Sequence, residues 1–371
     1  MSRTITALTV AGAGAAFELS EVELDEPGDG EVLVRVEAVG MCHADLAVRA
    51  GEFPFPLPGV VGHEGAGRVE AVGAGVTSVR PGDRVILTFD SCGRCAGCVS
   101  GVPTQCRDFV AHNFTNGARA DGSPTLWHAG SPLHGSFFGQ SSFATCALAG
   151  QRNAVPVTGA AAELAPELLA PLGCGVQTGA GAVLNVLRPG AGDSLVVFGA
   201  GAVGLAAVMA AALLPLRRVI VVDVQVSRLE LAARLGATDV VNGRDTDVVT
   251  ALRDLTGGGP ERALESSGVP AVLQQAVRGV AVGGLVGVVG VPPFGVTAPL
   301  DVAGLVNDSK RIVGIVEGAG NPPVFLPKLA GLVASGALPV GELVTTFPLA
   351  AVERAAEAMG AGSAIKPVLV P

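Results

Sequence analysis

The chain has 371 residues, and its 24 basic and 33 acidic side chains give a formal net charge of −9 at pH 7. This negative balance argues against nucleic acid or an anionic membrane surface as the partner. Hydrophobic residues make up 49% of the chain, enough for the cores of about two domains, so intrinsic disorder is excluded. The first residues lack the long apolar stretch of a secretory signal, and we therefore expect a cytoplasmic protein.

The first part of the chain consists of short, glycine-punctuated apolar runs. Residues 31–37, 65–72 and 83–87 alternate valine, isoleucine and leucine with charged or small residues. This texture predicts a β-rich, barrel-like domain.

Three separated segments carry the donor set of a catalytic zinc site. Cys42 and Asp45 lie in one segment, His63 and Glu64 are adjacent in the next, and Cys174 lies between two glycines. Taken singly, such a cysteine is usually a small buried hydrophobe, and such a histidine usually pairs with its neighbouring carboxylate. Together, Cys42, His63 and Cys174 form a Cys₂His set with a fourth position left for substrate. Asp45 and Glu64 are candidates to hydrogen-bond the far nitrogen of His63 and fix its tautomer.

A second cysteine cluster predicts a structural zinc site. Four of the seven cysteines fall close together, at Cys92, Cys95, Cys98 and Cys106. A glycine-containing loop of this kind can wrap four thiolates around one Zn²⁺ at about 2.3 Å. Unligated cysteines near solvent would oxidise readily, and the odd total of cysteines argues against a disulfide framework.

From residue 194 onward the pattern changes to alternating strands and helices. An apolar run at 194–198 leads into Gly199, Gly201 and Gly204 and then a helix of small residues. Gly199 permits a tight turn, Gly201 lets the backbone approach a pyrophosphate, and Gly204 allows close helix packing. The segment therefore predicts a dinucleotide site.

A second strand, residues 218–222, ends in Asp223, which lies 223 − 204 = 19 residues beyond the third glycine. A carboxylate there accepts hydrogen bonds from ribose hydroxyls and repels a 2′-phosphate. NAD is therefore favoured over NADP, although Arg228 weakens that preference.

The later part of the chain continues the alternation of one parallel sheet. We expect further strands at 236–242, 262–267, 284–290 and 311–316, and helices at 227–235, 248–255 and 271–280. The uncharged stretch 194–216 is long enough to cross a bilayer, but the glycines inside it favour a strand, a turn and a buried helix. Helical runs at 325–333 and 350–359 follow the last of these strands.

With these motifs in place, the chain resembles the zinc-containing medium-chain alcohol dehydrogenases, most of all the bacterial aryl-alcohol (benzyl alcohol) dehydrogenases. The segments that carry the resemblance surround Cys42, His63, the four-cysteine loop, residues 134–143 and Cys174. The resemblance covers nearly the whole chain. It implies reversible, NAD-dependent oxidation of an aromatic or allylic primary alcohol to its aldehyde, with two zinc ions per chain.

The family also implies a fold and an assembly. The fold is α/β, with a GroES-like β-rich catalytic domain at residues 1–170 and 318–371 that holds both zinc sites. A Rossmann coenzyme domain with a doubly wound parallel sheet occupies residues 171–317. The family further implies a homodimer or homotetramer that associates through the edge strand near residues 311–316.

Three more positions acquire roles from the resemblance. Thr178 and Val203 match positions that press the nicotinamide ring toward the substrate. Lys366 matches a basic position near the pyrophosphate, and it is equally consistent with an ordinary solvated charge.

One departure from the family concerns proton transfer. The Ser or Thr that begins the family's proton relay is Ala44 here, and a second relay position falls on Ala47. His43 is a candidate replacement because imidazole titrates near neutral pH, and it is equally a candidate contact to a coenzyme phosphate. The departure keeps one alternative open, a same-fold reductase of a conjugated C=C or iminium substrate. A separate alternative is a non-catalytic NAD-binding zinc protein, against which the intact set of Cys42, His63 and Cys174 argues.

Loops next to the zinc motifs supply candidates for an apolar substrate pocket. Each aromatic residue among them is equally consistent with a core position. The candidates are Thr88, Phe89, Phe114, Trp127 and Phe143.

Overall fold

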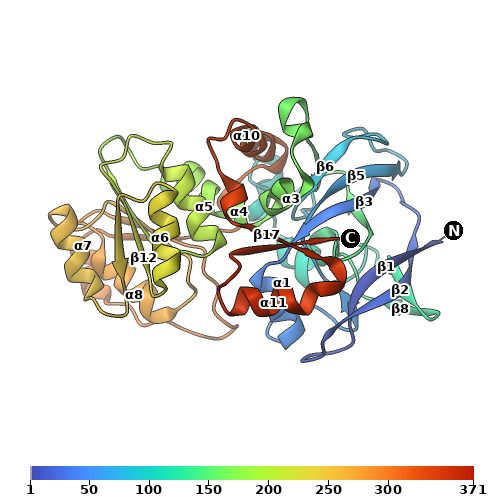
Figure 1. The fold of residues 1–371 in the computed structure, drawn as a ribbon, viewed down its shortest axis with the longest axis horizontal. Helices are drawn as coiled ribbons and strands as arrows, with labels where there is room; N and C mark the ends of the chain where they lie inside the picture. Colours follow the sequence, from blue (N-terminus) through green and yellow to red (C-terminus); the bar gives the residue numbers. More distant parts are fainter. Residues whose placement is uncertain (1) are drawn as a thin grey trace. The chain divides into compact units, whose positions relative to one another are not determined.

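Two β-sheets organise the first compact unit of the computed structural model, which describes residues 2–371 (Figure 1). This unit contains the chain up to Cys174 together with Asn321–Pro371. One sheet has the strand order β4-β1-β2-β7-β8, and the other has the order β10-β6-β5-β3-β18-β17, with β9 also paired to β3. The strands are β1 (Ser2–Val10), β2 (Phe17–Asp25), β3 (Glu31–Gly40), β4 (Gly59–Val60), β5 (Glu64–Val72), β6 (Arg84–Leu87), β7 (Leu126–His128), β8 (Ser131–Leu133), β9 (Cys146–Gly150), β10 (Ala154–Pro156), β17 (Val344–Pro348) and β18 (Lys366–Val370).

In the described residues of these two sheets, neighbouring strands pair antiparallel, except that β17 and β18 pair in parallel. Strand β3 lies at the centre of its sheet and is buried along most of its length, as its valine-rich sequence requires. Strand β18 pairs with the end of β3, so the last residues of the chain lie beside residues 39–40. This pairing brings the C-terminal strand close to the segment that holds Cys42.

Short helices connect these strands. Helix α1 begins immediately after Cys42, where the side chain of Asp45 accepts a hydrogen bond from the Cys42 N–H, and it ends at Gly51 with φ 78°. The α-helices of this unit are α1 (His43–Ala50), α2 (Ala96–Val99), α3 (Pro166–Leu169), α10 (Pro322–Ala334) and α11 (Val352–Gly360). The short 3₁₀ or π turns are η1 (Pro103–Gln105), η2 (Ala111–Thr115), η3 (Phe137–Gly139), η4 (Gly159–Glu163), η5 (Ala170–Gly173), η8 (Val340–Glu342) and η9 (Leu349–Ala351).

The second compact unit, residues 175–320, is built on one parallel six-stranded sheet with the order β13-β12-β11-β14-β15-β16. Its strands are β11 (Ser194–Phe198), β12 (Arg218–Asp223), β13 (Asp239–Asn242), β14 (Arg262–Glu265), β15 (Leu285–Val288) and β16 (Arg311–Gly314). Its helices are α4 (Gly175–Gly181), η6 (Ala182–Leu187), α5 (Ala202–Ala211), α6 (Val226–Arg234), α7 (Val248–Thr256), α8 (Pro270–Gly279), α9 (Val302–Asn307) and η7 (Glu317–Ala319).

The strand order of this sheet reverses between β11 and β14. At such a switch point the connections leave toward opposite sides, and a crevice opens at the carboxyl ends of the strands. The glycine turn after β11 lies at this edge, so the topology places it where doubly wound sheets bind nucleotides.

The predicted α/β class, with a β-rich part and a doubly wound parallel sheet, is confirmed. Every predicted strand of the parallel sheet forms, and all lie within their expected ranges except β12, which runs one residue further. The predicted helices agree with the observed limits within two residues, except that α10 begins three residues earlier than expected. The uncharged stretch 194–216 forms strand β11, the glycine turn and helix α5. Among the described residues, no helix is both long and apolar enough to span a bilayer.

Candidate metal centres and nucleotide site

Two thiols, an imidazole and a carboxylate meet in the first unit. Cys42 precedes α1, His63 precedes β5, Glu64 is the first residue of β5, and Cys174 follows η5. Their ligand atoms all lie within 4.8 Å of one another. His63 and Glu64 are fully buried, Cys174 is 9% exposed, and Cys42 is partly exposed.

Asp45 fixes the orientation of His63. Its Oδ1 lies 3.0 Å from His63 Nδ1 and accepts the Gly62 N–H at 3.0 Å, while Oδ2 accepts the Cys42 N–H at 2.8 Å. With Nδ1 occupied in this way, the other ring nitrogen is the one available for coordination. His63 Nε2 is buried and has no hydrogen-bond partner among the described residues. A metal ion bound at Nε2 and the two thiolates would satisfy this atom, so the residues fit a Cys₂His zinc site.

The electrostatics of the cluster favour the thiolate form of Cys42. Hydrogen bonding with Cys174, and then the neighbouring His63 and Lys366, lower the pKa of the Cys42 thiol well below its usual value despite burial. Burial lowers the pKa of His63, but the charge and hydrogen bond of Asp45 outweigh it and raise that pKa well above its usual value. Thiolates are the metal-ligating form of cysteine, so Cys42 is prepared to coordinate.

Glu64 takes a partner that the sequence did not predict. Its Oε1 accepts a hydrogen bond from Lys366 Nζ at 2.8 Å, and the same Nζ donates to the backbone oxygen of Met41 at 3.0 Å. Burial raises the pKa of Glu64 to about 7, against the opposing charge of Lys366. Interpreting Lys366 as a solvated charge was wrong, because its side chain is 3% exposed and ion-paired. The reason is the β18–β3 pairing, which carries Lys366 into the interior.

Aromatic rings surround the histidine of this cluster. The ring of Phe138 stacks on His63 with centroids 4.3 Å apart and planes 16° apart, and Phe137 meets the imidazole edge-on at 5.3 Å. Phe114 packs edge-on against Phe138 at 4.9 Å. Sequence reasoning missed Phe137 and Phe138 as site residues, because two adjacent phenylalanines are typical of a core and nothing local shows which ring faces His63.

The other pocket candidates lie elsewhere in the first unit. Phe143 is fully buried, as is Thr88, whose hydroxyl donates to the Gly173 oxygen at 2.7 Å, and Phe89 is only 3% exposed. Trp127 lies on β7 and lines a separate cavity of about 770 Å³ beside residues 115–124. Of the five candidates, Phe114 is the one that contacts the ring stacked on His63.

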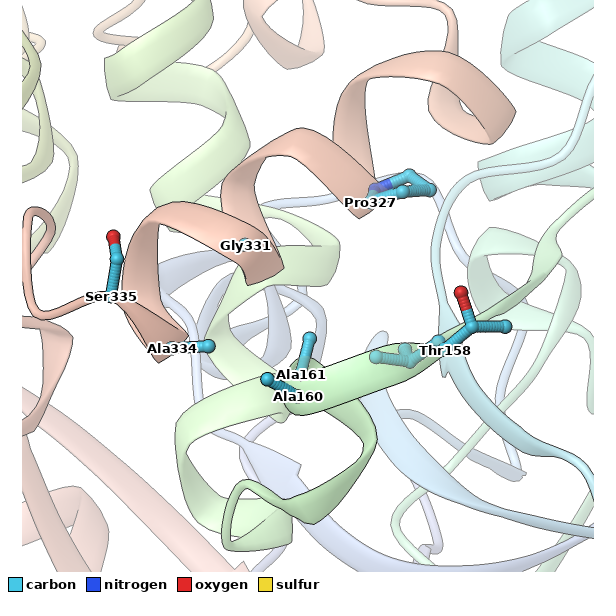
Figure 2. A pocket seen from close by; sticks show the side chains of 8 residues that line it. Thr158, Ala160, Ala161, Pro327, Gly331, Ala334 and Ser335 are labelled. Atoms are coloured by element: carbon cyan, nitrogen blue, oxygen red, sulfur yellow. The ribbon is translucent and has the colours of Figure 1, made fainter.

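A further hollow of about 300 Å³ lies between η4 and α10 (Figure 2). Small residues line it, and none of them has a titratable or metal-ligating side chain. They are Val157, Thr158, Ala160, Ala161, Pro327, Gly331, Ala334 and Ser335. The hollow therefore offers no chemistry of its own.

The four-cysteine loop is compact. The sulfurs of Cys92, Cys95, Cys98 and Cys106 lie within 4.8 Å of one another, and the N–H groups of Cys92 and Cys95 point at the sulfurs of Cys106 and Cys92. Backbone hydrogen bonds from Cys98 and Arg107 lower the pKa of Cys95 to about 6, whereas burial raises that of Cys106 to about 12. Four sulfurs at this spacing fit a tetrahedral zinc ion with no position left for substrate.

In the second unit, the glycine turn and Asp223 come together as the spacing predicts. Gly199 adopts φ 92°, and α5 begins directly after Gly201. Asp223 Oδ2 accepts the N–H of Ala200, inside the turn, at 2.7 Å. A side chain at Gly204 would collide with the Gly199 oxygen, so glycine is required there. Strand β12 thus ends with its carboxylate beside the turn.

Other predicted coenzyme contacts lie on α4, α5 and α6 of the same unit. Val203 is in the first turn of α5. The backbone oxygen of Val203 lies so close to Gly179 that a side chain at Gly179 would collide with it. Thr178, the neighbour of Gly179 in the chain, therefore lies near Val203. Arg228 on α6 is partly buried, and its Nε has no hydrogen-bond partner in the described part of the chain.

One residue of this region was missed by the sequence analysis. Glu317 is 8% exposed, has φ 47°, and accepts a hydrogen bond from Gln177 Nε2 at 2.8 Å. Its carboxylate also lies 3.5 Å from the Thr178 hydroxyl. A lone glutamate in a glycine-rich segment gives no local signal of such burial.

The first turns of α1 contain the two positions at which the family has proton-relay residues, and these positions are partly exposed to solvent. His43, the first residue of α1, is exposed, and Ala44 and Ala47 on the same helix are partly exposed.

Comparison with known proteins identifies the class. Residues 28–158 match the family model of the alcohol dehydrogenase GroES-like domain, and residues 202–333 match that of zinc-binding dehydrogenases. The protein is thus an oxidoreductase that acts on CH–OH donors. A geraniol dehydrogenase from Castellaniella defragrans is 42% identical over 358 residues, covering 96% of this chain and 95% of that protein. The chain belongs to the zinc-containing medium-chain alcohol dehydrogenase family.

Solved structures agree with this assignment. An alcohol dehydrogenase zinc-binding domain protein from Burkholderia ambifaria superposes with a TM-score of 0.97 at 48% identity, over 100% of both chains. The benzyl alcohol dehydrogenase from Acinetobacter calcoaceticus superposes with a TM-score of 0.95 at 43% identity, over 99% of both chains. Within its family the chain therefore resembles the bacterial aryl-alcohol dehydrogenases.

Proposed function

We propose that the protein is a zinc- and NAD-dependent dehydrogenase of aromatic or allylic primary alcohols, which it converts reversibly to aldehydes. The balanced reaction is RCH₂OH + NAD⁺ ⇌ RCHO + NADH + H⁺. The observation that carries this proposal is the buried, partnerless Nε2 of His63, which lies with the thiols of Cys42 and Cys174 next to a cluster of phenyl rings. The relatives named for geraniol, an allylic alcohol, and for benzyl alcohol support the substrate class.

Two metal sites follow from the donor sets. We assign a catalytic zinc to Cys42, His63 and Cys174, and a structural zinc to the four-cysteine loop. When bound, zinc at the first site supplies a Lewis acid that lowers the pKa of a hydroxyl group. Asp45 holds the His63 imidazole in the tautomer that leaves Nε2 free, and the buried Glu64–Lys366 pair keeps compensating charges next to the thiols.

The protein must also carry the hydroxyl proton to solvent. Ala44 and Ala47 have no group that can transfer a proton, and we assign this task to His43, which is exposed at the start of α1. The same histidine is the family's candidate contact to a coenzyme phosphate, and the pH dependence of turnover in His43→Ala distinguishes the two roles. An unchanged profile assigns His43 to the phosphate.

For the coenzyme we propose NAD, which supplies the hydride acceptor at nicotinamide C4. Asp223 would bind the ribose hydroxyls, and its charge would repel the 2′-phosphate of NADP. The turn glycines and the N-terminus of α5 would bind the pyrophosphate. The remaining coenzyme contacts are assigned by resemblance to Thr178, Val203, Arg228 and Lys366. For Lys366 this contact requires sharing its ion pair with Glu64.

The domain limits and the assembly belong to the same proposal. We assign residues 1–170 and 318–371 to the catalytic domain and 171–317 to the coenzyme domain. The compact units divide the chain a few residues later, after Cys174 and after Gly320, so that all three proposed ligands of the catalytic zinc belong to the first unit. We further propose a homodimer or homotetramer that associates through β16, the edge strand of the parallel sheet. Exposed apolar side chains on β16 and in the chain segments before and after it support this association: Phe294, Val302, Val306, Ile312 and Val316.

The test is the appearance of reduced nicotinamide after purified protein is mixed with benzyl alcohol, cinnamyl alcohol or geraniol. NAD and NADP are supplied separately. We expect turnover with NAD in native protein and loss of turnover in Cys174→Ser. Cys146→Ser is the control and should keep native turnover, because Cys146 lies outside both clusters. If zinc-loaded protein neither oxidises these alcohols nor reduces the corresponding aldehydes, the result would instead favour a reductase of C=C or C=N bonds.

A further inference from the structure

We propose that Phe138 is a positioning residue for the zinc ligand His63. The inference rests on the metal site of the proposed function, but it concerns how that site is built. It is carried by ring geometry, backbone conformation and hydrogen bonds within the first unit.

The imidazole of His63 is restrained on three sides. Asp45 holds Nδ1 at 3.0 Å, Phe138 covers one face of the ring at 4.3 Å, and Phe137 meets it edge-on at 5.3 Å. A hydrogen bond at Nδ1 alone fixes one point and leaves the ring able to tilt about it. The nearly parallel Phe138 ring, 16° from the imidazole plane, blocks that tilt. The two restraints together determine where Nε2 points.

Phe138 reaches this place only through an unfavourable backbone conformation. Its φ of 51° and ψ of 34° lie in the left-handed region, which side chains with a Cβ rarely adopt. Ser136 and Ser141 on either side also have positive φ, at 62° and 49°. Strained residues of this kind persist where the surroundings over-determine them, and they cluster at functional sites. An ordinary core phenylalanine would not require this strain.

The strained segment is held by buried side chains. Asn153 is fully buried, and its Nδ2 donates to the backbone oxygens of Phe138 at 3.5 Å, Gly139 at 3.0 Å and Thr88 at 3.3 Å. Asn153 therefore restrains the two peptide oxygens that define the turn.

The same segment is tied to the backbone of His63. Gln140 Nε2 donates to the His63 oxygen at 2.9 Å and to the Thr88 oxygen at 3.1 Å, and the Ser141 hydroxyl donates to the Val60 oxygen at 2.6 Å. The two stacked rings thus rest on one connected hydrogen-bond network. A change in the segment is transmitted to the imidazole.

The surrounding rings provide a matched control. Phe114 supports Phe138 edge-on at 4.9 Å, and Phe109 in turn packs against Phe114 at 5.9 Å. Phe109 is 8% exposed and has no ring contact with His63 among the described residues. Replacing Phe109 therefore costs a similar apolar contact without touching the imidazole.

The experiment compares Phe138→Leu, Phe138→Gly and Phe109→Leu with the native zinc-loaded protein. Glycine adopts φ 51° without strain, so Phe138→Gly keeps the turn and removes only the ring. The first measurement is the rate at which a chelator removes each of the two zinc ions. The second is the visible spectrum after Co²⁺ replaces zinc at the Cys42, His63 and Cys174 site, because its bands report ligand geometry.

We expect both Phe138 variants to lose one zinc ion about 10- to 100-fold faster than native protein, the range typical when a group that orients a metal ligand is removed. Their Co²⁺ bands should shift, and the zinc of the four-cysteine loop should be retained, which shows that the fold is intact. Phe109→Leu should match native protein in both measurements.

Native zinc release and an unshifted Co²⁺ spectrum in both Phe138 variants would overturn the proposal, as would equal effects in Phe109→Leu. A native protein that holds only one zinc ion would refute its premise. Failure of the proposed function gives a different result, namely native protein that holds two zinc ions but does not oxidise any alcohol. The zinc release rates of the variants can still be compared in that case, so they test the role of Phe138 independently.

Discussion

Replacing Asp45 by asparagine perturbs the centre of the candidate active site with almost no change in shape. The buried carboxylate serves the N–H groups of Cys42 and Gly62 and the Nδ1 of His63. An asparagine oxygen placed at Oδ1 still serves Gly62 and His63. Its NH₂ group then faces the Cys42 N–H, and two donors meet.

The expected magnitude follows from this count. Two donors are left without an acceptor, the Cys42 N–H and the new NH₂ group, at about 1–3 kcal/mol each, and the bond to His63 loses the part of its strength that comes from charge. The sum, roughly 2–6 kcal/mol, is a large share of a total stability of about 5–15 kcal/mol. Alanine would strand three buried donors, at roughly 3–9 kcal/mol, which is why asparagine is the better probe.

The assay is denaturant unfolding of zinc-loaded protein together with a zinc count per chain. Asp45→Asn should unfold at lower denaturant and lose the catalytic zinc about 10- to 100-fold more readily, while the four-cysteine site keeps its ion. Asp83→Asn is the control, because Asp83 also accepts a backbone N–H but in an exposed turn. Native stability and zinc retention in Asp45→Asn would refute the role given to this carboxylate.

Three further changes test the coenzyme and structural-zinc assignments. Asp223→Ser should raise kcat/KM for NADP relative to NAD by about tenfold or more, because the charge that repels a 2′-phosphate is gone; an unchanged ratio would count against Asp223 as the selector. Gly204→Ala places a methyl group against the Gly199 oxygen, and it should destabilise the protein by about 1–3 kcal/mol and weaken NAD binding as measured by titration; native binding would contradict the close packing. Cys98→Ser should leave one zinc ion per chain and lower the melting temperature, and two retained ions would exclude the four-sulfur site.

The parallel sheet could be predicted from the sequence because the patterns that indicate it are local. A buried apolar strand, a glycine turn, a helix and a carboxylate at fixed spacing all fall within residues 194–223. Strand β12 pairs in parallel with β11, and Val222 lies opposite Phe198, the last residue of β11. Asp223 meets the turn at Ala200 for this reason.

The candidate zinc ligands could also be chosen from the sequence, because cysteine and histidine beside glycine are chemically distinctive. Their surroundings were not. The partner of Glu64 is 302 residues away in the chain, and only the pairing of β18 with β3 brings Lys366 to it. Phe138 faces His63 because its backbone is left-handed, and no periodicity predicts such a conformation for phenylalanine.

The most direct measurement of the central claim uses benzyl alcohol carrying two deuterium atoms on the reacting carbon. Native zinc-loaded protein is incubated with this alcohol and NAD⁺, and the reduced coenzyme is examined by mass spectrometry and NMR. Our account predicts deuterium at C4 of the reduced nicotinamide and one deuterium left on the aldehyde carbon. Benzaldehyde formed without label in the coenzyme, or no benzaldehyde with any of the alcohols tested, would contradict it.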